Sequence, residues 1–380
     1  MIMRVISGGV CAPGGFVAAG INCGIKKKKK DLALIYSKVP AVAAGLFTAN
    51  TFKAAPVRLS KKYLSTGKAQ AIIANSGNAN CFTGTYGLIY AERMADAAAG
   101  ALAVKKEDVL VASTGIIGRP LPIERIEKSI PKLVESLSDK GDSSAAEAIL
   151  TTDTFIKEIA VQARIGNSSV KIGAMAKGAG MISPRLSTMF CFITTDVLIT
   201  PEALRYAIKI AADKSFNNIT VDGCMSTNDT IFVLANGLAK NPCISLRDKN
   251  FSLFCETLSY VCLEMARAIV RDAEGATKFI EINVEGARDE ALAREIGLSV
   301  ANSNLFKTAV YGESPNWGRI IAAVGSFGLK VKEENIRIKF SSFRRKNVKI
   351  DIILGIGKAG CRIYTSDLTP EYVKINAAYN

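Results

Sequence analysis

Apolar residues recur along the chain with the two periods of regular secondary structure, two residues in strands and about 3.6 in helices. Strand-like runs alternate with turns between residues 32 and 75. Further strand patterns lie at 109–111, 158–165, 169–175, 189–193, 218–222, 230–234, 278–284, 335–340, 347–354 and 360–365. Helical patterns lie at 90–104, 121–137, 200–216, 251–271, 289–302 and 316–324.

Local signals sharpen this pattern at several points. Gly166-Asn167 predicts the tip of a hairpin between two alternating segments, and Thr200-Pro201 predicts an N-cap followed by proline at the first helical position. The two amphipathic helices before residue 140 should pack against a sheet, with Pro131 kinking the second. Residues 236–248 are polar and rich in turn formers, which indicates a structural seam.

Length and composition set outer limits on the fold. The 380 residues leave room for two domains, and 49% hydrophobic residues are ample for a core. Residues 5–25 are apolar enough to suggest a secretion signal, but Pro13 and four glycines would break its helix, and we reject that interpretation. No other apolar run is long enough to predict a membrane span.

Histidine is absent, which excludes Ser/His/Asp catalysis, Cys/His catalysis and every histidine-ligated metal site. Any nucleophile here needs another base. The nine cysteines are scattered without a CxxC pair and predict reduced, mostly buried thiols in a cytoplasmic protein. Carboxylate-only magnesium or calcium sites stay open, but no EF-hand or Walker pattern occurs, and we predict no metal.

A formal net charge of +15 raises the alternative of a nucleic-acid-binding protein. The densest cluster, Lys26 to Lys30, precedes a strand-like segment and is interpreted as a solvated turn. Other basic residues are spread along the chain and are not interleaved with aromatic ones, as stacking platforms would be. We therefore expect no nucleic-acid partner, although the charge could favour encounter with small anionic metabolites.

A Gly-rich segment at residues 177–190 carries the most suggestive chemistry. Its two glycines and Pro184 lead to Ser187-Thr188, which stands just before the apolar run 189–193. A threonine freed at the start of a chain can use its own amine as the base for its hydroxyl. The alternative is an ordinary loop that leads into a core strand.

Two polar loops follow short buried strands. Ser113-Thr114-Gly115 presents a hydroxyl and a glycine N–H that could together stabilise an oxyanion, or it is only a turn at a strand end. The loop at residues 75–80 is rich in Asn and Gly; it suits recognition of an acyl or carboxylate group, or it is only a tight turn.

The segment Lys177-Gly-Ala-Gly-Met-Ile, then Pro184 and Ser187-Thr188-Met189, resembles the self-cleavage signature of the glutamate N-acetyltransferase / ornithine acetyltransferase family. Other blocks resemble that family in the same order, so the resemblance covers nearly the whole chain. They begin at Gly8, Ala12, Ala74, Ser113, Thr151, Thr220, Ser226, Ala273, Asn316 and Ile375.

The resemblance implies an α/β fold, a four-layer α/β/β/α sandwich with Thr188 between the sheets and a smaller α/β C-terminal region. The implied domains are residues 1–240, residues 241–365, and a tail at 366–380 that returns to the active site. It also implies cleavage between Ser187 and Thr188, giving chains 1–187 and 188–380. Two copies of each cleaved chain would assemble.

The implied activity is transfer of acetyl from N-acetyl-L-ornithine to L-glutamate through an ester on Thr188, a step of arginine biosynthesis. No cofactor is implied, and whether acetyl-CoA also serves as a donor stays open. Thr114 and Gly115 inherit the oxyanion-hole role. The positions that match the family's substrate-binding residues are Thr151, Lys177, Thr188, Glu274 and Asn376.

Each of these residues also has a structural interpretation. Thr151 could be a cap, Lys177 a solvated loop cation, Glu274 a helix-end charge and Asn376 a turn residue. A self-processing amidase or aminopeptidase, which would deliver the acyl group to water, is the alternative enzyme.

The chain departs from the family pattern at three places. Ser187 replaces the usual alanine, Cys224-Met225 stands where Asp-Thr is typical, and one further C-terminal hydroxyl residue is lacking. These departures put in doubt the cleavage speed, a polar role for residues 224 and 225, and the closure of the substrate site.

Overall fold

The computed structural model describes residues 3–183, 189–326 and 332–378. They form two compact units. The first unit takes its described residues from 1–178, 185–215 and 225–265, and the second from 179–184, 216–224 and 266–380. The second unit therefore includes two short segments from within the range of the first.

A nine-stranded sheet forms the centre of the first unit among the described residues, in the order β1-β6-β7-β8-β9-β3-β4-β5, with β2 paired to β3. The long strand β3 makes the sheet continuous, because it pairs with β2 and β4 over its first part and with β9 from Val42 to Phe47. The strands are β1 (Met3–Ile6), β2 (Phe16–Ile21), β3 (Leu32–Phe47), β4 (Lys68–Asn78), β5 (Val109–Ile116), β6 (Lys157–Ile165), β7 (Ser168–Lys177), β8 (Phe190–Thr195) and β9 (Thr230–Ala235).

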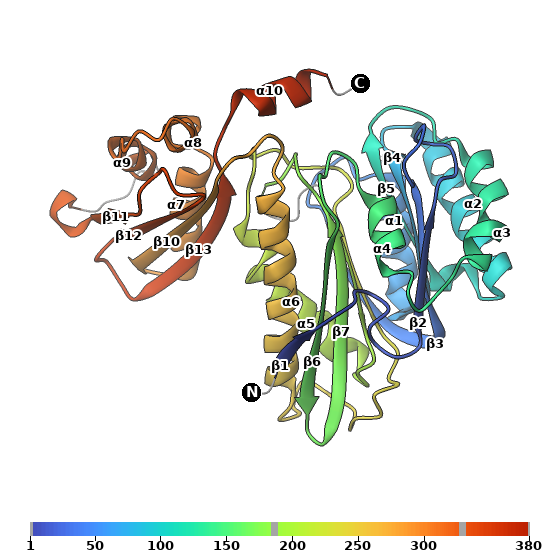
Figure 1. The fold of residues 1–380 in the computed structure, drawn as a ribbon. Coiled ribbons are helices and arrows are strands. Elements are labelled where there is room, and N and C mark those ends of the chain that lie inside the picture. Colours follow the sequence, from blue (N-terminus) through green and yellow to red (C-terminus); the bar gives the residue numbers. More distant parts are fainter. Residues whose placement is uncertain (1–2, 184–188, 327–331, 379–380) are drawn as a thin grey trace. The chain divides into compact units, whose positions relative to one another are not determined.

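Helices cover this sheet: Figure 1 shows α2 and α3 side by side near β2 to β5, and α5 packs against β3. Helix α3 buries Ile123, Ile126, Ile130 and Leu133 on one face. The helices are α1 (Ala55–Tyr63), α2 (Gly84–Leu102), α3 (Ile123–Glu135), α4 (Asp142–Ile149), α5 (Pro201–Asp213) and α6 (Phe251–Arg271), which ends in the second unit, with short 3₁₀ turns at Leu64–Thr66 and Lys106–Asp108.

The second unit is built on a four-stranded sheet in the order β11-β12-β10-β13. Helix α7 packs closely on this sheet, because a Cβ at Gly297 would lie 2.6 Å from Ile363 Cγ1. The elements are β10 (Phe279–Ala287), α7 (Glu290–Ala301), α8 (Asn304–Tyr311), α9 (Gly318–Gly325), β11 (Arg337–Phe340), β12 (Asn347–Ile353), β13 (Ala359–Ser366) and α10 (Pro370–Ala377), with 3₁₀ turns at Phe216–Asn218 and Glu333–Asn335.

The α/β fold class with a smaller α/β part is confirmed, and so are the hairpin of β6 and β7 and the N-cap at Thr200, which accepts a hydrogen bond from Ala203 N. Two element predictions are wrong. Residues 32–75 contain the helix α1, which is short and has a proline as its second residue, and residues 218–222 make only an isolated bridge from Ile219 to Tyr364.

The compact units have other bounds than the predicted domains. They divide at 265/266, inside α6, whereas the prediction placed the boundary at 240, and the polar segment 236–248 lies wholly in the first unit. No helix in the described part of the chain is long and apolar enough to cross a membrane.

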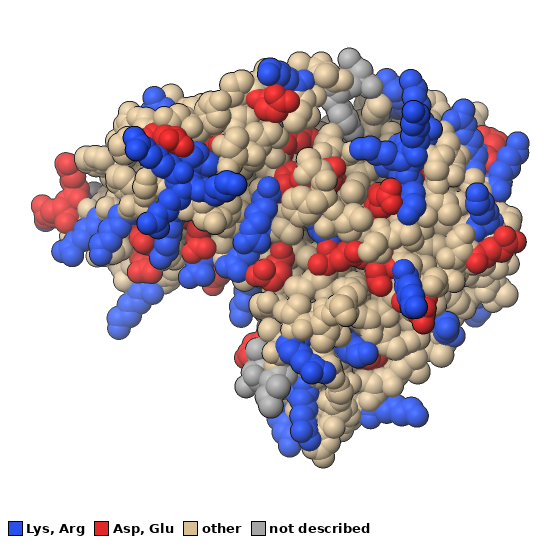
Figure 2. Space-filling model, in the orientation of Figure 1, with Lys and Arg blue, Asp and Glu red and all other residues tan. Residues whose placement is uncertain are grey.

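Basic side chains do not form one continuous surface on the face shown in Figure 2, because blue Lys and Arg are scattered there among red Asp and Glu. That distribution agrees with the expectation that the positive charge is spread along the chain.

Candidate active site

The two polar segments predicted as loops lie mostly inside the parallel strands β4 and β5, at the same ends of these strands. Residues 75–78 pair with residues 113–116, and Ser113 Oγ donates to Asn75 Oδ1 at 2.6 Å. Thr114 is buried, and Gly115 has φ +132°. A Cβ at Gly115 would lie 2.3 Å from the carbonyl carbon of Gly77, so only glycine fits where the two backbones approach.

Asn228 holds this edge together from a third element. Its buried Nδ2 donates to Ala79 O at 2.7 Å and to Ser113 O at 2.6 Å. These two carbonyls belong to the ends of the two polar loops. The side chain of Asn228 therefore fixes the position of Thr114 relative to the loop that follows β4.

Lys177 reaches the same place as the last residue of β7. It is 2% exposed, and its Nζ donates to Thr114 Oγ1 at 3.4 Å, across 63 positions of sequence. A threonine hydroxyl that accepts from an ammonium keeps its own proton free to donate elsewhere. The interpretation of Lys177 as a solvated loop cation is thus wrong, because the side chain is buried next to the predicted oxyanion donor.

Asp153 balances the buried positive charge. Its Oδ1 accepts from Lys157 Nζ at 2.7 Å and from Gly178 N at 2.7 Å, and both side chains of the Asp153–Lys157 pair are fully buried. Burial alone would raise the pKa of Asp153, but the charges of Lys177 and Lys157 outweigh it and hold that pKa well below its usual range. Asp153 is therefore a carboxylate.

Thr151 lies beside this carboxylate. Its backbone N donates to Asp153 Oδ2 at 3.0 Å, and its hydroxyl lies 3.5 Å from the same oxygen. The structure thus links three of the predicted site residues in the first unit. The Asp153 carboxylate interacts with Thr151 and with the charge of Lys177, and the Thr114 hydroxyl accepts from Lys177.

Lys26 is a further cation of this group that the sequence analysis assigned to a solvated turn. The turn wraps around Asp31, whose carboxylate accepts from Cys23 N and Lys26 N, while Lys26 Nζ donates to Leu150 O at 2.5 Å. Burial lowers the pKa of Lys26 to about 8, and the charge of Lys177 acts in the same direction. The prediction is wrong for Lys26, whereas residues 27–29 are exposed.

Ser187 and Thr188 lie outside the described residues. The residue after them is placed: Met189 N donates to Asp229 Oδ1 at 2.9 Å, and Phe190, which starts β8, pairs with Lys177. Met189, the residue after Thr188 in the sequence, therefore lies at the end of β8 that adjoins Lys177.

Asp229 is a buried carboxyl directly next to this point. Its Oδ2 has no hydrogen-bond partner among the described residues, and burial raises its pKa well above the ordinary value, against the opposing charge of Lys177. Burial thus favours the protonated form of Asp229, which accepts from the backbone N of Met189, the residue after Thr188. Asn228 and Asp229 belong to the family-like block that begins at Ser226, but nothing in the sequence pattern showed that these side chains turn inward.

The second unit holds the other two predicted residues, and it brings them together. Asn376 on α10 donates its Nδ2 to Glu274 Oε2 at 2.8 Å. A Cβ at Gly180 would lie 2.4 Å from Glu274 Oε2, so the glycine of the Gly-rich segment seats against this carboxylate. The alternative of Asn376 as a turn residue is wrong, because it lies in α10, whereas Glu274 does follow the end of α6 and contacts Asn376 across 102 positions of sequence.

Asp222 fixes the Gly-rich segment in the same unit. Its carboxylate accepts from Met181 N at 2.6 Å, Ile182 N at 3.0 Å and Cys224 N at 3.0 Å, and the hydroxyl of Tyr372 on α10 donates to it at 3.3 Å. The approach to Ser187 is therefore tied to the helix that carries Asn376. The described residues contain no His/Cys/Asp/Glu group suited to a metal ion.

Thr114→Ala is expected to lower turnover by roughly one to three orders of magnitude, because one donor to a developing oxyanion is lost. Steady-state rates at matched thermal stability check this. Thr114→Ser keeps the hydroxyl that accepts from Lys177 and should recover most of the rate. If Thr114→Ala turned over like the wild type, Thr114 would be only a turn residue.

Comparison with known proteins places the chain in a family. The ArgJ family model matches residues 17–346. The arginine biosynthesis bifunctional protein ArgJ of Symbiobacterium thermophilum is 46% identical, covering 99% of this chain and 100% of the relative, and that of Caldanaerobacter subterraneus subsp. tengcongensis is 44% identical over 99% and 100%. Among solved structures, an ornithine acetyltransferase complexed with ornithine from Mycobacterium tuberculosis is 41% identical, covering 48% of this chain and 98% of that chain, with a TM-score of 0.45. By its match to the family model and its full-length likeness to these relatives, the chain belongs to the ArgJ family.

Proposed function

We propose that this protein is a self-cleaving acetyltransferase of arginine biosynthesis that moves acetyl from N-acetyl-L-ornithine to L-glutamate through an ester on Thr188. The observation that carries the proposal is the contact of Lys177 with Thr114 at the point where residue 189 enters β8. A buried cation, an oxyanion donor and the attachment point of Thr188 are thus neighbours in the first unit.

Cleavage would come first. The Thr188 hydroxyl attacks the carbonyl carbon of Ser187, the C–N bond breaks as the amine takes up a proton, and an ester between Ser187 and Thr188 results. Water then hydrolyses the ester and releases residues 1–187 from residues 188–380. The second chain starts with the free amine of Thr188, whose reference pKa of roughly 7.7–8.0 lets it accept a proton near neutral pH.

Acetyl transfer would use the same hydroxyl. The amine of Thr188 takes the hydroxyl proton, the oxygen attacks the acetyl carbonyl of N-acetylornithine, and ornithine leaves as its amine is protonated. The amine of glutamate then attacks the acetyl ester and restores the threonine. Thr114 Oγ–H and Gly115 N–H stabilise both oxyanions; Lys177, by donating to Thr114 Oγ1, strengthens that donor.

The remaining assignments rest on the resemblance and the contacts within each unit. We propose that Thr151 and Lys177 in the first unit, and Glu274 and Asn376 in the second, bind the polar and charged ends of the amino-acid substrates. One amide is exchanged for another of similar energy, so the reaction needs no cofactor. Assembly from two copies of each cleaved chain is part of the same proposal.

Trapping the ester tests the proposal. With N-acetylornithine and no glutamate, mass spectrometry should find the Thr188 chain heavier by one acetyl group. Initial rates with both substrates should give parallel double-reciprocal lines, because the two half-reactions are separated by release of ornithine. Fast discharge by glutamate is expected, since a bound and oriented amine has an effective concentration that water cannot match.

Two outcomes would contradict it. Acetate released without glutamate as fast as N-acetylglutamate forms with it would identify an amidase. Absence of any adduct in a cleaved, folded and active sample would remove Thr188 from the transfer mechanism.

A further inference from the structure

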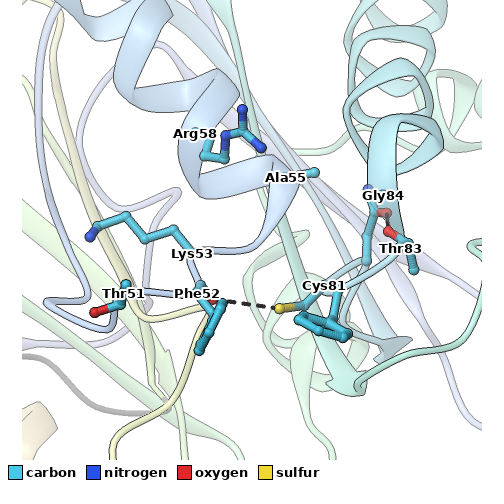
Figure 3. Close-up of a pocket in the computed structure, with 10 residues that line it drawn as sticks. Thr51, Phe52, Lys53, Ala55, Arg58, Cys81, Thr83 and Gly84 are labelled. Atoms are coloured by element: carbon cyan, nitrogen blue, oxygen red, sulfur yellow. Dashed lines mark hydrogen bonds between the residues drawn. The ribbon is translucent and has the colours of Figure 1, made fainter.

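A cavity of about 460 Å³ opens between the starts of α1 and α2 in the first unit (Figure 3). We call it the α1–α2 cavity; residues from 51–58 and 80–84 line it. Its volume lies in the range of small-molecule sites. None of the residues assigned above to acetyl transfer lines it, so it is separate from the candidate active site.

The charge of the α1–α2 cavity is positive. Lys53 and Arg58 line it, and no acidic residue does. Figure 3 shows both side chains on the α1 side, with Thr83 and Gly84 at the start of α2 across from Arg58; Lys53 Nζ uses one of its three donors on Asn50 O at 2.8 Å. Among the described residues the Arg58 guanidinium has no hydrogen-bond or ion-pair partner, which leaves its five donors available for an anion.

The start of α2 adds to this positive character, whereas at the start of α1 Ala54 N and Ala55 N already donate to Thr227 O and Asn80 O. Neither α1 nor α2 has an acidic residue in its first turn or a side chain that caps it. The Thr83 hydroxyl, which stands at the cap position of α2, instead donates to Asn80 Oδ1 at 3.2 Å. The Thr83 side chain therefore does not cap the first-turn N–H groups of α2, and Gly84, the first residue of α2, lines the cavity.

An aromatic pair forms the other part of the wall. Phe52 is 64% exposed and Phe82 is 75% exposed, and their rings pack edge to face with centroids 5.8 Å apart. Phenylalanine is usually buried, and two exposed rings at one cavity indicate a surface that a ligand covers. Phe82 holds this position at φ +57°, with the neighbouring Cys81 O accepting from Gly118 N at 3.0 Å.

The cavity is joined to the oxyanion donors by the backbone that Asn228 holds. Asn228 Nδ2 contacts Ala79 O, directly before the cavity residue Asn80, and Ser113 O, directly before Thr114. A ligand in the cavity would thus lie beside Asn80, in the loop that Asn228 joins to the segment carrying Thr114. A long ligand anchored here could extend its far end toward Thr114.

We propose that the α1–α2 cavity binds a nucleoside phosphate, with its phosphates at Arg58, Lys53 and the start of α2 and its base against Phe52 and Phe82. Ornithine and its N-acetyl derivative carry no ring, and the free amino group of either would meet two cations. A nucleoside phosphate fits both parts of the wall, because its phosphate can bind the two cations and its flat base can pack against the two phenylalanines. Two ligands share this chemistry: the nucleotide end of acetyl-CoA and a free adenine nucleotide.

Calorimetric titration of the wild-type protein with coenzyme A, ADP and adenosine tests the site directly. Coenzyme A, ADP or both should bind, and adenosine, which lacks phosphate, should bind at least ~10-fold more weakly. The double variant Lys53→Met/Arg58→Met should weaken binding of the phosphate ligands at least ~10-fold. Phe52→Ala/Phe82→Ala should also weaken them, through loss of the surface against the base.

A matched control lies on the same helix. Lys61 and Lys62 occupy the last turn of α1 and do not line the cavity, so Lys61→Met/Lys62→Met makes the same charge change and should leave binding within about twofold. The proposal is overturned if neither coenzyme A nor ADP binds the wild type. It is also overturned if both double variants, melting like the wild type, bind these ligands as tightly as the Lys61/Lys62 control.

Kinetics identifies the natural ligand, and this step alone rests on the proposed function. If the nucleotide end of acetyl-CoA binds here, Lys53→Met/Arg58→Met should raise the KM for acetyl-CoA at least ~10-fold and leave the KM for N-acetylornithine unchanged. Loss of ADP binding with unchanged use of acetyl-CoA assigns the site to a free nucleotide. A protein that transfers no acetyl from N-acetylornithine would refute the proposed function without altering the titration result.

Discussion

Replacing Thr188 by alanine is expected to leave the purified protein as one chain of 40.5 kDa and to lower acetyl transfer by roughly four to six orders of magnitude. The same hydroxyl is proposed as the nucleophile in both reactions, and no histidine is present in the sequence to activate another one. The wild type should run as two polypeptides, the second beginning at Thr188. Intact mass, N-terminal sequencing and steady-state rates measure the three results.

Two neighbouring substitutions serve as controls. Thr188→Ser keeps a hydroxyl and an N-terminal amine after cleavage, so it should still cut, at a changed rate. Ser187→Ala removes the hydroxyl before the scissile bond and should leave both activities in place, since Ser187 only supplies the carbonyl. A Thr188→Ala protein that is cut before residue 188, or that transfers acetyl at the wild-type rate, contradicts the mechanism.

Asp153→Asn should cost about 3–5 kcal/mol in the free energy of unfolding, the second large effect. Asp153 is the buried carboxylate that pairs with Lys157 and lies within the charge field of Lys177. Neutralising it removes a negative charge that interacts with two buried lysines. Denaturant unfolding at pH 7, in the uncut Thr188→Ala background, makes the comparison between single chains.

The contribution of Asp153 to the stability of the wild type should change with pH in one definite direction. Because the pKa of Asp153 is lowered in the folded protein, its stabilisation is complete above its unfolded pKa, near 4, and is lost as the pH falls toward the folded value. Glu334→Gln is the surface control: its pair with Lys332 is exposed at 74% and 79%, and it should change stability by less than about 1 kcal/mol. Equal effects of the two substitutions would show that the buried charges are not coupled.

The sequence predicted most elements whose pattern is local. The hairpin of β6 and β7 and the helices α3, α5 and α6 follow from period and capping, because each buries one regular face. Helix α1 was missed, since Pro56 and a nine-residue length leave little periodic signal. Strand β3 pairs with β4 over its first part and with β9 over its last part. No local pattern predicts this pairing, because the partners are distant in sequence.

The candidate site was predictable as a set of residues, through the resemblance, but not as an electrostatic group. Asp153 and Lys157 form a buried pair that reads in the sequence as ordinary loop and strand charges. Lys26 stands in a run of five lysines, and only the wrapping of that turn around Asp31 directs it inward. Burial decides the roles of these residues, and burial arises from contacts across the whole sheet.

The strand order of the large sheet gives cleavage a lasting consequence for the protein. Strands β8 and β9 lie between β7 and β3, so a cut after Ser187 would leave two strands of the second polypeptide hydrogen-bonded on both sides to the first. The two polypeptides would be interleaved partners that never met as separate molecules. Once pulled apart they could regain the sheet only by a second-order encounter that depends on concentration. The mature protein would then persist through slow unfolding, a form of kinetic stability that its uncut precursor does not need.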